Sequence, residues 1–240
     1  MHYESKVGHI GGNLSALDAI LFLHSEVMKG DDVFVLSKGH SAGALYVSLW
    51  SVGKLSDKEL DSFHQDGSKM AGHPAGGWCP DIPFATGSLG HGLSLAAGIA
   101  LGKKMKGEKG RVFCLLSDGE WEEGSTWEAL IFTAHRRLDN LTLLVDANGL
   151  QGFGKTTEIA SLEPMGDKIR PFGLDVHEIN GHNPVELASV LTSESETAKV
   201  VILRTIKGNG VSFMEGRMEW HYLPMSAEQY RQAVKEVSGG

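Results

Sequence analysis

The sequence predicts an α/β fold with a doubly wound, mainly parallel sheet flanked by helices. The first observation is a strand–helix–strand unit, in which apolar runs at residues 111–117 and 141–145 enclose a helical stretch at 126–132. The second is that strand-like and helix-like segments alternate along most of the chain. The third is size, because 240 residues with 41% hydrophobic content can bury one large core. We therefore expect residues 1–240 to form a single domain.

Apolar spacing predicts the remaining elements in chain order. A helix is expected from an N-cap at Asn13 to about Met28. Ser56-Asp-Lys-Glu59 has the pattern of a capping box, which predicts that another helix begins there. Residues 67–90 are irregular, and a loop of this length in a compact domain is usually functional. The other expected elements are a strand at 32–36, helices at 44–50 and 93–101, a strand at 175–179, a helix at 183–192, a strand at 199–203 and a helix at 227–237.

The composition argues against two classes of partner. A formal net charge of -8 and a pI near 5.7 provide no basic surface for nucleic acid. No apolar run reaches the length needed to cross a bilayer, so we expect neither a nucleic-acid nor a membrane partner. The two cysteines, Cys79 and Cys114, make no disulfide framework, which favours a reducing compartment. We expect a cytoplasmic protein.

Oxygen-bearing side chains follow the two strands of the central unit. Asp118 ends the first apolar run and Asn148 follows the second, so both are expected beyond the carboxyl ends of parallel strands, where ligands bind. A carboxylate, an amide oxygen and a backbone carbonyl suit Mg²⁺, which completes its shell with phosphate oxygens and water. The alternative is local, because Asp118 could cap the next helix and Asn148 could support a turn before Gly149. Spacing alone does not decide between the two.

Histidines on glycine turns form a second group of candidate residues. Five of the eleven histidines follow a glycine directly, namely His9, His40, His73, His91 and His182. Any one of them alone is better interpreted as a surface or capping residue. Several together could hydrogen-bond phosphate and sugar hydroxyls, and could transfer protons near pH 7.

These residues lie in blocks that resemble one enzyme family. Asp118-Gly119 followed by Asn148 resembles the thiamine-diphosphate motif, in which an asparagine follows Gly-Asp-Gly by about thirty residues. Further blocks match those of transketolase in the same order, at residues 8–12, 36–40, 72–74, 86–90 and 219–221. The match covers nearly the whole chain, which resembles the amino-terminal half of a transketolase as found in split, two-subunit versions. The implied fold is the diphosphate-binding half of the thiamine-diphosphate-binding fold.

The resemblance implies three sets of site residues. The metal ligands would be Asp118, Asn148 and the carbonyl of Leu150, holding Mg²⁺ or, in its place, Ca²⁺ or Mn²⁺. The residues expected to contact thiamine diphosphate are His40, Gly87, Ser88, Leu89, Asp118, Gly119, Asn148 and His221. The residues expected to face the substrate as catalytic groups are His9, His73 and His221.

The sequence departs from the family in two ways. Ser117 replaces a glycine of the motif and Ala147 replaces an asparagine, but neither position supplies a metal ligand. The larger departure is that the pyrimidine-binding and C-terminal domains are absent, and with them the glutamate that activates the cofactor. We therefore expect transfer of a two-carbon ketol unit from a ketose to an aldose only with a second, pyrimidine-binding subunit. The expected assembly is α₂β₂, and the expected substrates are sugars or sugar phosphates.

Three other functions compete with this one. A 1-deoxyxylulose-phosphate synthase shares the Gly-His-x-Gly-Gly opening, but the blocks that end at His40 and His221 favour transketolase. A non-catalytic relic of the fold is disfavoured because the metal-ligand and histidine positions are retained. A nucleotide-binding protein would need a Gly-x-Gly-x-x-Gly turn after its first strand, and this sequence lacks one there.

Overall fold

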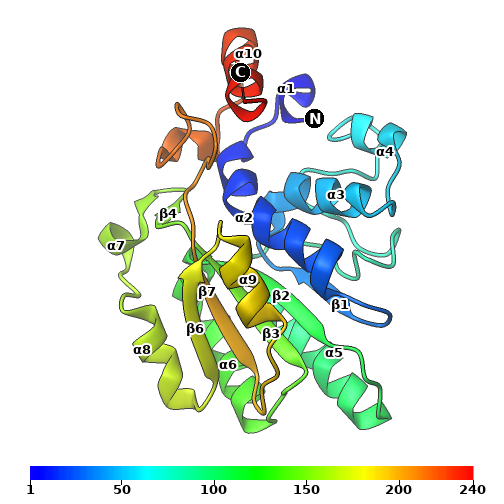
Figure 1. Ribbon diagram of the computed structural model, residues 1–240, viewed down its shortest axis with the longest axis vertical. Helices are drawn as coiled ribbons and strands as arrows, with labels where there is room; N and C mark the ends of the chain where they lie inside the picture. Colours follow the sequence, from blue (N-terminus) through cyan, green and yellow to red (C-terminus); the bar gives the residue numbers. More distant parts are fainter. Residues whose placement is uncertain (240) are drawn as a thin grey trace.

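A five-stranded parallel sheet forms the centre of the computed structural model, which describes residues 1–239 (Figure 1). Gly240, the last residue of the expected domain, lies outside the described residues. The order across the sheet is β1-β2-β3-β7-β6, and every neighbouring pair is parallel. These strands are β1 (Val33–Leu36), β2 (Val112–Ser117), β3 (Leu141–Ala147), β6 (Asp175–Asn180) and β7 (Lys199–Arg204). A separate antiparallel hairpin joins β4 (Leu150–Gln151) to β5 (Gly154–Lys155).

Helices and short helical turns connect the strands. The α-helices are α1 (His2–Ser5), α2 (Ile10–Phe22), α3 (Ala42–Ser51), α4 (Asp57–Asp61), α5 (Gly92–Lys106), α6 (Gly124–His135), α7 (Thr156–Ile159), α8 (Met165–Ile169), α9 (Pro184–Leu191) and α10 (Ala227–Val237). The short turns are the π turn η1 (Leu23–Val27) and the 3₁₀ turns η2 (Gly39–Ser41), η3 (Gly119–Glu122), η4 (Arg170–Phe172) and η5 (Met218–His221). No helix within residues 1–239 is long and apolar enough to span a membrane.

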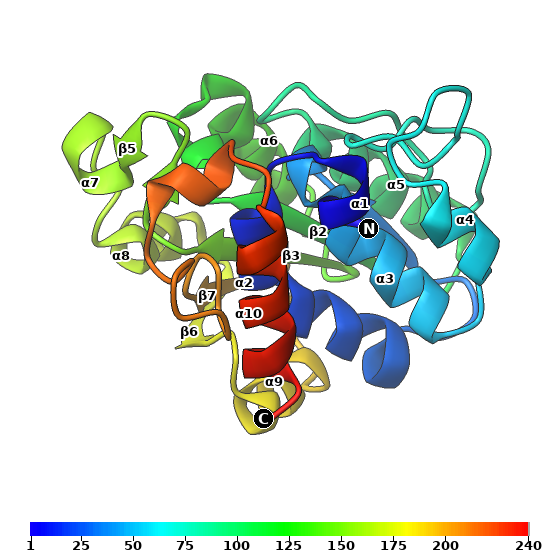
Figure 2. The ribbon, with the colours of Figure 1, turned by 90° about the horizontal axis from the view of Figure 1, so that it is seen from above.

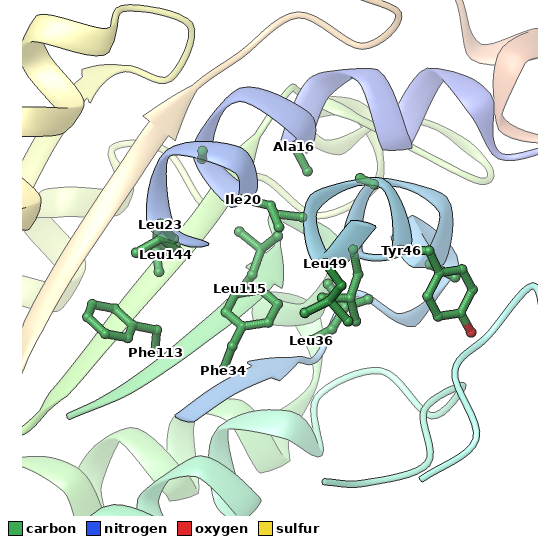
Figure 3. Packing of buried hydrophobic residues seen from close by; sticks show 14 of the residues in the cluster. Ala16, Ile20, Leu23, Phe34, Leu36, Tyr46, Leu49, Phe113, Leu115 and Leu144 are labelled. Carbon is green, nitrogen blue, oxygen red and sulfur yellow. The ribbon is translucent and has the colours of Figure 1, made fainter. Parts of the chain in front are cut away.

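Alternate strand residues bury against different helices on the two faces of the sheet. Phe113 and Leu115 pack with α2, α3 and α9 on one face (Figure 3), whereas Cys114 and Leu116 pack with α5, α6 and α8 on the other. This alternation follows from the two-residue period of a strand. Because helices cover both faces of a parallel sheet, the predicted doubly wound fold is confirmed. The carboxyl-terminal helix α10 lies away from the sheet beside α1, where Tyr3 and Tyr230 stack (Figures 1 and 2).

Most predicted elements agree with the structure within a few residues. The main difference is the start of α2, which begins at Ile10 after His9 and not after Asn13. Asn13 lies inside the helix because its amide connects three segments. It donates to the carbonyls of His9 (2.8 Å) and His40 (3.1 Å) and accepts from the amide of Ala44 (2.7 Å). The capping box at Ser56 and Glu59 is present, although the helix α4 that it starts has five residues.

The packing makes a first prediction about stability. Replacing Leu115 with alanine should lower the free energy of unfolding by about 3–4 kcal/mol, since this fully buried side chain lies in the interior strand β2 and its truncation leaves a cavity. Urea unfolding followed by circular dichroism measures the change. The control Val185→Ala, at a position 74% exposed on α9, should alter stability by no more than about 0.5 kcal/mol. Equal losses for the two variants would contradict this account of the core.

Candidate functional site

A cavity of about 250 Å³ lies beyond the carboxyl ends of the central strands. Its lining brings together segments that are far apart in the sequence. All but one of the site residues predicted from the sequence line this cavity. The predicted residues that line it are His9, His40, His73, Gly87, Leu89, Asp118, Gly119, Asn148, Leu150 and His221. The exception, Ser88, lines a neighbouring cavity of about 340 Å³ with the other side of the same loop. The cavity also contains residues that sequence reasoning missed, including Lys38, Gln151, Phe153, Lys207 and Tyr222.

Asp118 and Asn148 serve as local turn residues and also line this cavity. Asp118 caps η3, and its two carboxylate oxygens accept hydrogen bonds from the amides of Gly119 (2.8 Å) and Gly149 (2.7 Å). The carboxamide oxygen of Asn148 accepts from the amide of Leu150 at 3.0 Å, and Gly149 takes the left-handed conformation with φ of 74°. The capping and turn explanations are therefore correct. They do not exclude a ligand role, because the same side chains face the cavity.

A buried ion pair lies directly behind Asn148. Lys38 and Asp146 are 1% and 0% exposed, and the ammonium of Lys38 contacts a carboxylate oxygen of Asp146. The same oxygen accepts from Ser15 Oγ (2.6 Å) and from Asn148 Nδ2 (3.2 Å), while Thr205 donates to the other oxygen. Although burial alone would raise it, the pKa of Asp146 lies below its usual value because of Lys38 and these hydroxyl donors. The pair fixes the Asn148 amide with its nitrogen toward Asp146.

Asp118 lacks the cationic partner that Asp146 has. Within residues 1–239 its carboxylate makes no salt bridge, and it is only 5% exposed. Burial, and then the negative charge of Asp146, raise the pKa of Asp118 to about 6. An ionised Asp118 would therefore be stabilised by a cation.

Lys207 supplies a positive charge at the inner end of the cavity. It is 1% exposed, and its ammonium lies 3.1 Å from His221 Nδ1 and 3.4 Å from the carbonyl of Leu150. Burial, and then repulsion from Lys38, lower its pKa to about 8. No sequence pattern pointed to Lys207, since a lysine shortly after a strand usually extends into solvent.

Four imidazoles form a cluster against this charged end. The ring centroid of His9 lies 5.5 Å from that of His40, 5.6 Å from that of His73 and 5.2 Å from that of His221. Burial, with nearby positive groups second, lowers the pKa of all four, to about 4 for His9 and about 3 for His221. All four are therefore neutral at pH 7. They can accept hydrogen bonds from hydroxyl groups and donate them to carbonyl oxygens.

Close backbone contacts hold the cluster in place. His9 precedes α2 with φ of 66°, and its amide donates to the carbonyl of His221 at 3.2 Å. A side chain at Gly8 would come within 2.3 Å of the Tyr222 carbonyl, so only glycine lets these two segments approach so closely. Gly8 is therefore required for the close contact between the segment before α2 and the segment around Tyr222.

Two of the glycine–histidine pairs lie outside this cluster. His182 bonds to Asp18 at 2.6 Å and accepts from the amide of Ile206, which joins α2 to the segment after β7. His91 is exposed at the start of α5, and its ring nitrogen contacts the Leu89 carbonyl. The glycine–histidine pattern alone therefore predicted more cavity residues than the structure brings together.

The cavity combines a carboxylate suited to a divalent cation, a buried ammonium and a wall of neutral imidazoles. Among residues 1–239, no group of three or more histidine, cysteine or acidic side chains could hold a metal alone. A metal at Asp118 and Asn148 would thus need further oxygen ligands from backbone carbonyls, water or a bound molecule. A metal-bound anionic group with hydroxyl-bearing portions nearby matches these features.

Comparison with known proteins gives the family. Residues 4–239 match the family model described as transketolase, thiamine diphosphate binding domain. The chain is 41% identical to an apulose-4-phosphate transketolase subunit of Phocaeicola vulgatus, and the alignment covers 98% of this chain and 88% of that protein. It is 37% identical to the 6-deoxy-6-sulfo-D-fructose transketolase subunit of a Clostridium species, with 96% and 88% coverage.

Longer transketolases match this chain over part of their length. Human transketolase is 34% identical, and the alignment covers 96% of this chain but 38% of the human protein. The crystal structure of transketolase from Campylobacter jejuni superposes with a TM-score of 0.90 at 28% identity, and covers 99% of this chain and 40% of that one. The chain therefore belongs to the transketolase family, and along nearly its whole length it is that family's thiamine-diphosphate-binding domain.

Proposed function

We propose that this chain is one subunit of a two-subunit transketolase, which transfers a two-carbon ketol unit from a ketose to an aldose. The observation that carries this proposal is the convergence of Asp118, Asn148 and the four-histidine cluster on one cavity. The names of the relatives from Phocaeicola and Clostridium, which are transketolase subunits of similar length, support it further. We propose that residues 1–240 act as a single domain in this enzyme.

The residues present fit a metal-bound diphosphate. Asp118 is a buried carboxylate that makes no salt bridge among residues 1–239, and burial, followed by the charge of Asp146, raises its pKa. Because the Asn148 nitrogen is held by Asp146, the amide oxygen is the atom left for a cation. The Leu150 carbonyl already lies beside one positive group, the Lys207 ammonium. We propose Asp118, Asn148 and Leu150 as ligands of Mg²⁺, for which Ca²⁺ or Mn²⁺ could substitute, with Gly119, His40 and His221 next to the diphosphate.

The chain's own residues would bind and orient both cofactor and substrate. When bound, thiamine diphosphate supplies the ring that stabilises the carbanion of ketol transfer. Gly87, Ser88 and Leu89 are proposed to contact its rings. His9, His73 and His221 are proposed as the catalytic groups: as neutral imidazoles they can accept hydrogen bonds from sugar hydroxyls and donate hydrogen bonds to a carbonyl.

We propose that a second subunit completes the site. The resemblance implies that the glutamate that activates thiamine diphosphate belongs to a pyrimidine-binding domain, and the chain spans about two fifths of the length of human and Campylobacter jejuni transketolases. Exposed apolar side chains on α5 and α6, among them Leu95, Ile131 and Phe132, offer a surface for such a partner. We infer that the partner binds the pyrimidine ring and that the assembly is α₂β₂.

The proposed substrates are sugars or sugar phosphates. The only lysines that line the described cavity, Lys38 and Lys207, are both buried at its inner end. An acidic group at the far end of a substrate would therefore be recognised by the partner subunit. Both cysteines are free, and we propose that the reaction takes place in the reducing environment of the cytoplasm.

The second prediction concerns activity. The purified chain with thiamine diphosphate and Mg²⁺ should show no ketol transfer, and adding the partner subunit should restore it, because the activating glutamate comes from the partner. A coupled assay with a ketose donor and an aldose acceptor measures the rate. Asp118→Asn should reduce the reconstituted rate at least about 100-fold through loss of a metal ligand, whereas Asp61→Asn, at an exposed position on α4, should match wild type. Full activity of the chain alone would refute the proposal.

The third prediction concerns pH. A carboxyl group whose pKa is raised from 3.8 to about 6 on folding stabilises the fold fully below pH 4, and this contribution is lost as the pH rises through 6. In EDTA, the unfolding free energy of wild type minus that of Asp118→Asn should therefore fall by about 2 kcal/mol between pH 4 and pH 7. Parallel urea titrations of both proteins measure the difference.

Adding Mg²⁺ and pyrophosphate should reverse this trend in wild type. A metal requires the ionised carboxylate, so the stabilisation should appear above about pH 6 in wild type and be absent in Asp118→Asn. Identical pH profiles of the two proteins in EDTA would contradict the burial of an unpaired carboxylate. Equal stabilisation of both by Mg²⁺ and pyrophosphate would contradict its role as a ligand.

A further inference from the structure

Glu120 is a fully buried acid that the proposed mechanism does not use. It lies in η3, two residues after Asp118, and is 0% exposed. Within residues 1–239 it makes no salt bridge. Burying an unpaired carboxylate is costly unless hydrogen bonds compensate, so its contacts require an explanation.

Four donors from three separate segments surround this carboxylate. Ser117, at the end of β2, donates to one oxygen through its amide (2.8 Å) and its hydroxyl (3.3 Å). The hydroxyl of Ser37, just after β1, and the amide of Gly90 (3.0 Å) donate to the other oxygen. The carboxylate therefore ties two strand ends to the loop that precedes α5.

The loop is held at further points by the same network. The hydroxyl of Ser37 also accepts from the amide of Gly92 at 3.1 Å. The carbonyl of Gly90 accepts from Ser125 Oγ, at the start of α6, at 3.0 Å. The Gly90 carbonyl is thus held by the start of α6, and the Gly92 amide by the segment that follows β1.

Close packing leaves no room for the loop to settle elsewhere. Gly90 has φ of 79°, and a Cβ there would lie 2.7 Å from both Glu123 Cβ and Ser125 Oγ. A Cβ on Gly92 would lie 2.3 Å from Ser37 Cβ. The glycines allow the loop to reach Glu120, and Glu120 supplies the polar contacts that keep it there.

We propose that Glu120 is a positioning residue, which sets the distance between the metal-binding turn at 118–119 and the ring-contacting residues Gly87 and Leu89. Asp118, the cap of η3, lines the cavity, while Glu120, within η3, binds the amide of Gly90 in the loop whose residues Gly87 and Leu89 line the same cavity. This inference rests on the proposed function, since it assigns the turn at 118–119 to the diphosphate end of thiamine diphosphate and the residues Gly87 and Leu89 to its ring end. A purely structural role would stabilise the whole fold without distinguishing the ends of the ligand.

The test compares Glu120→Gln with wild type, each in complex with the partner subunit. Glutamine keeps the shape but presents one acceptor oxygen and one NH₂ group, so at least one buried donor loses its acceptor. Hydrogen exchange measured by mass spectrometry should show the amides of Gly90 and Gly92 exchanging about tenfold faster, with β3 and residues 112–116 of β2 unchanged; Ser117 is left out because its own amide donates to Glu120. Glu196→Gln, an exposed acid on the loop before β7, serves as the matched control and should leave exchange unchanged.

Two ligands separate positioning from general stability. Isothermal titration with Mg²⁺ and thiamine diphosphate should give a Kd raised about tenfold in Glu120→Gln, whereas Mg²⁺ with pyrophosphate, which lacks the rings, should change by less than about twofold. Ser125→Ala removes the second anchor of Gly90 and should show the same selectivity. If Glu120→Gln does not fold, the two titrations are made with Ser125→Ala in its place.

The outcomes distinguish this inference from the proposed function. If the wild-type complex binds neither ligand, the proposed function is refuted. If wild type binds both, and the variant shows unchanged loop exchange or weakens both ligands by the same factor, only the positioning role of Glu120 is refuted.

Discussion

The buried ion pair between Lys38 and Asp146 is the contact on which the arrangement of the site depends. Lys38 follows β1, Asp146 belongs to β3, and the pair also bonds to α2 through the Gly12 carbonyl and Ser15. Removing either partner would leave an uncompensated charge in the core, at a cost of about 3–5 kcal/mol. The turn that carries Asn148 is therefore held by the same contacts that join the sheet to α2. The site cannot shift without disturbing the fold.

Much of the fold could be predicted because buried parallel strands are apolar runs and their spacing allows one crossover helix. Two features of the fold were predicted wrongly or missed, and each has a local physical cause. Asn13 resembles an N-cap in sequence, but its amide bonds to the carbonyl of His40 and the amide of Ala44, which are distant in sequence. The hairpin of β4 and β5 was missed because each strand has two residues, too few for any hydrophobic period, and glycines surround them.

The candidate site was predictable in its outline and not in its supporting residues. Asp118 and Asn148 were identified because polar residues at the ends of neighbouring parallel strands must lie close together. Lys38, Asp146, Glu120 and Lys207 were missed, since a charged residue near a strand end is normally solvated, and no local pattern shows that it is buried with a distant partner. The glycine–histidine pattern also included His91 and His182, which do not line the cavity. A preceding glycine indicates a flexible turn, but it does not show where the histidine side chain points.

The four-histidine cluster makes the two ends of the cavity differ in charge. Each imidazole is neutral at pH 7, so positive charge is confined to the inner end, where Lys207 lies beside the Leu150 carbonyl. The rim carries apolar groups, with Phe153 86% exposed and Leu89 36% exposed. A molecule with one anionic end and one uncharged end is attracted inward by one end alone. The reversed pose would leave its charge against carbon and its uncharged end against an ammonium, so the cavity selects the polarity of its ligand by electrostatics, independently of shape.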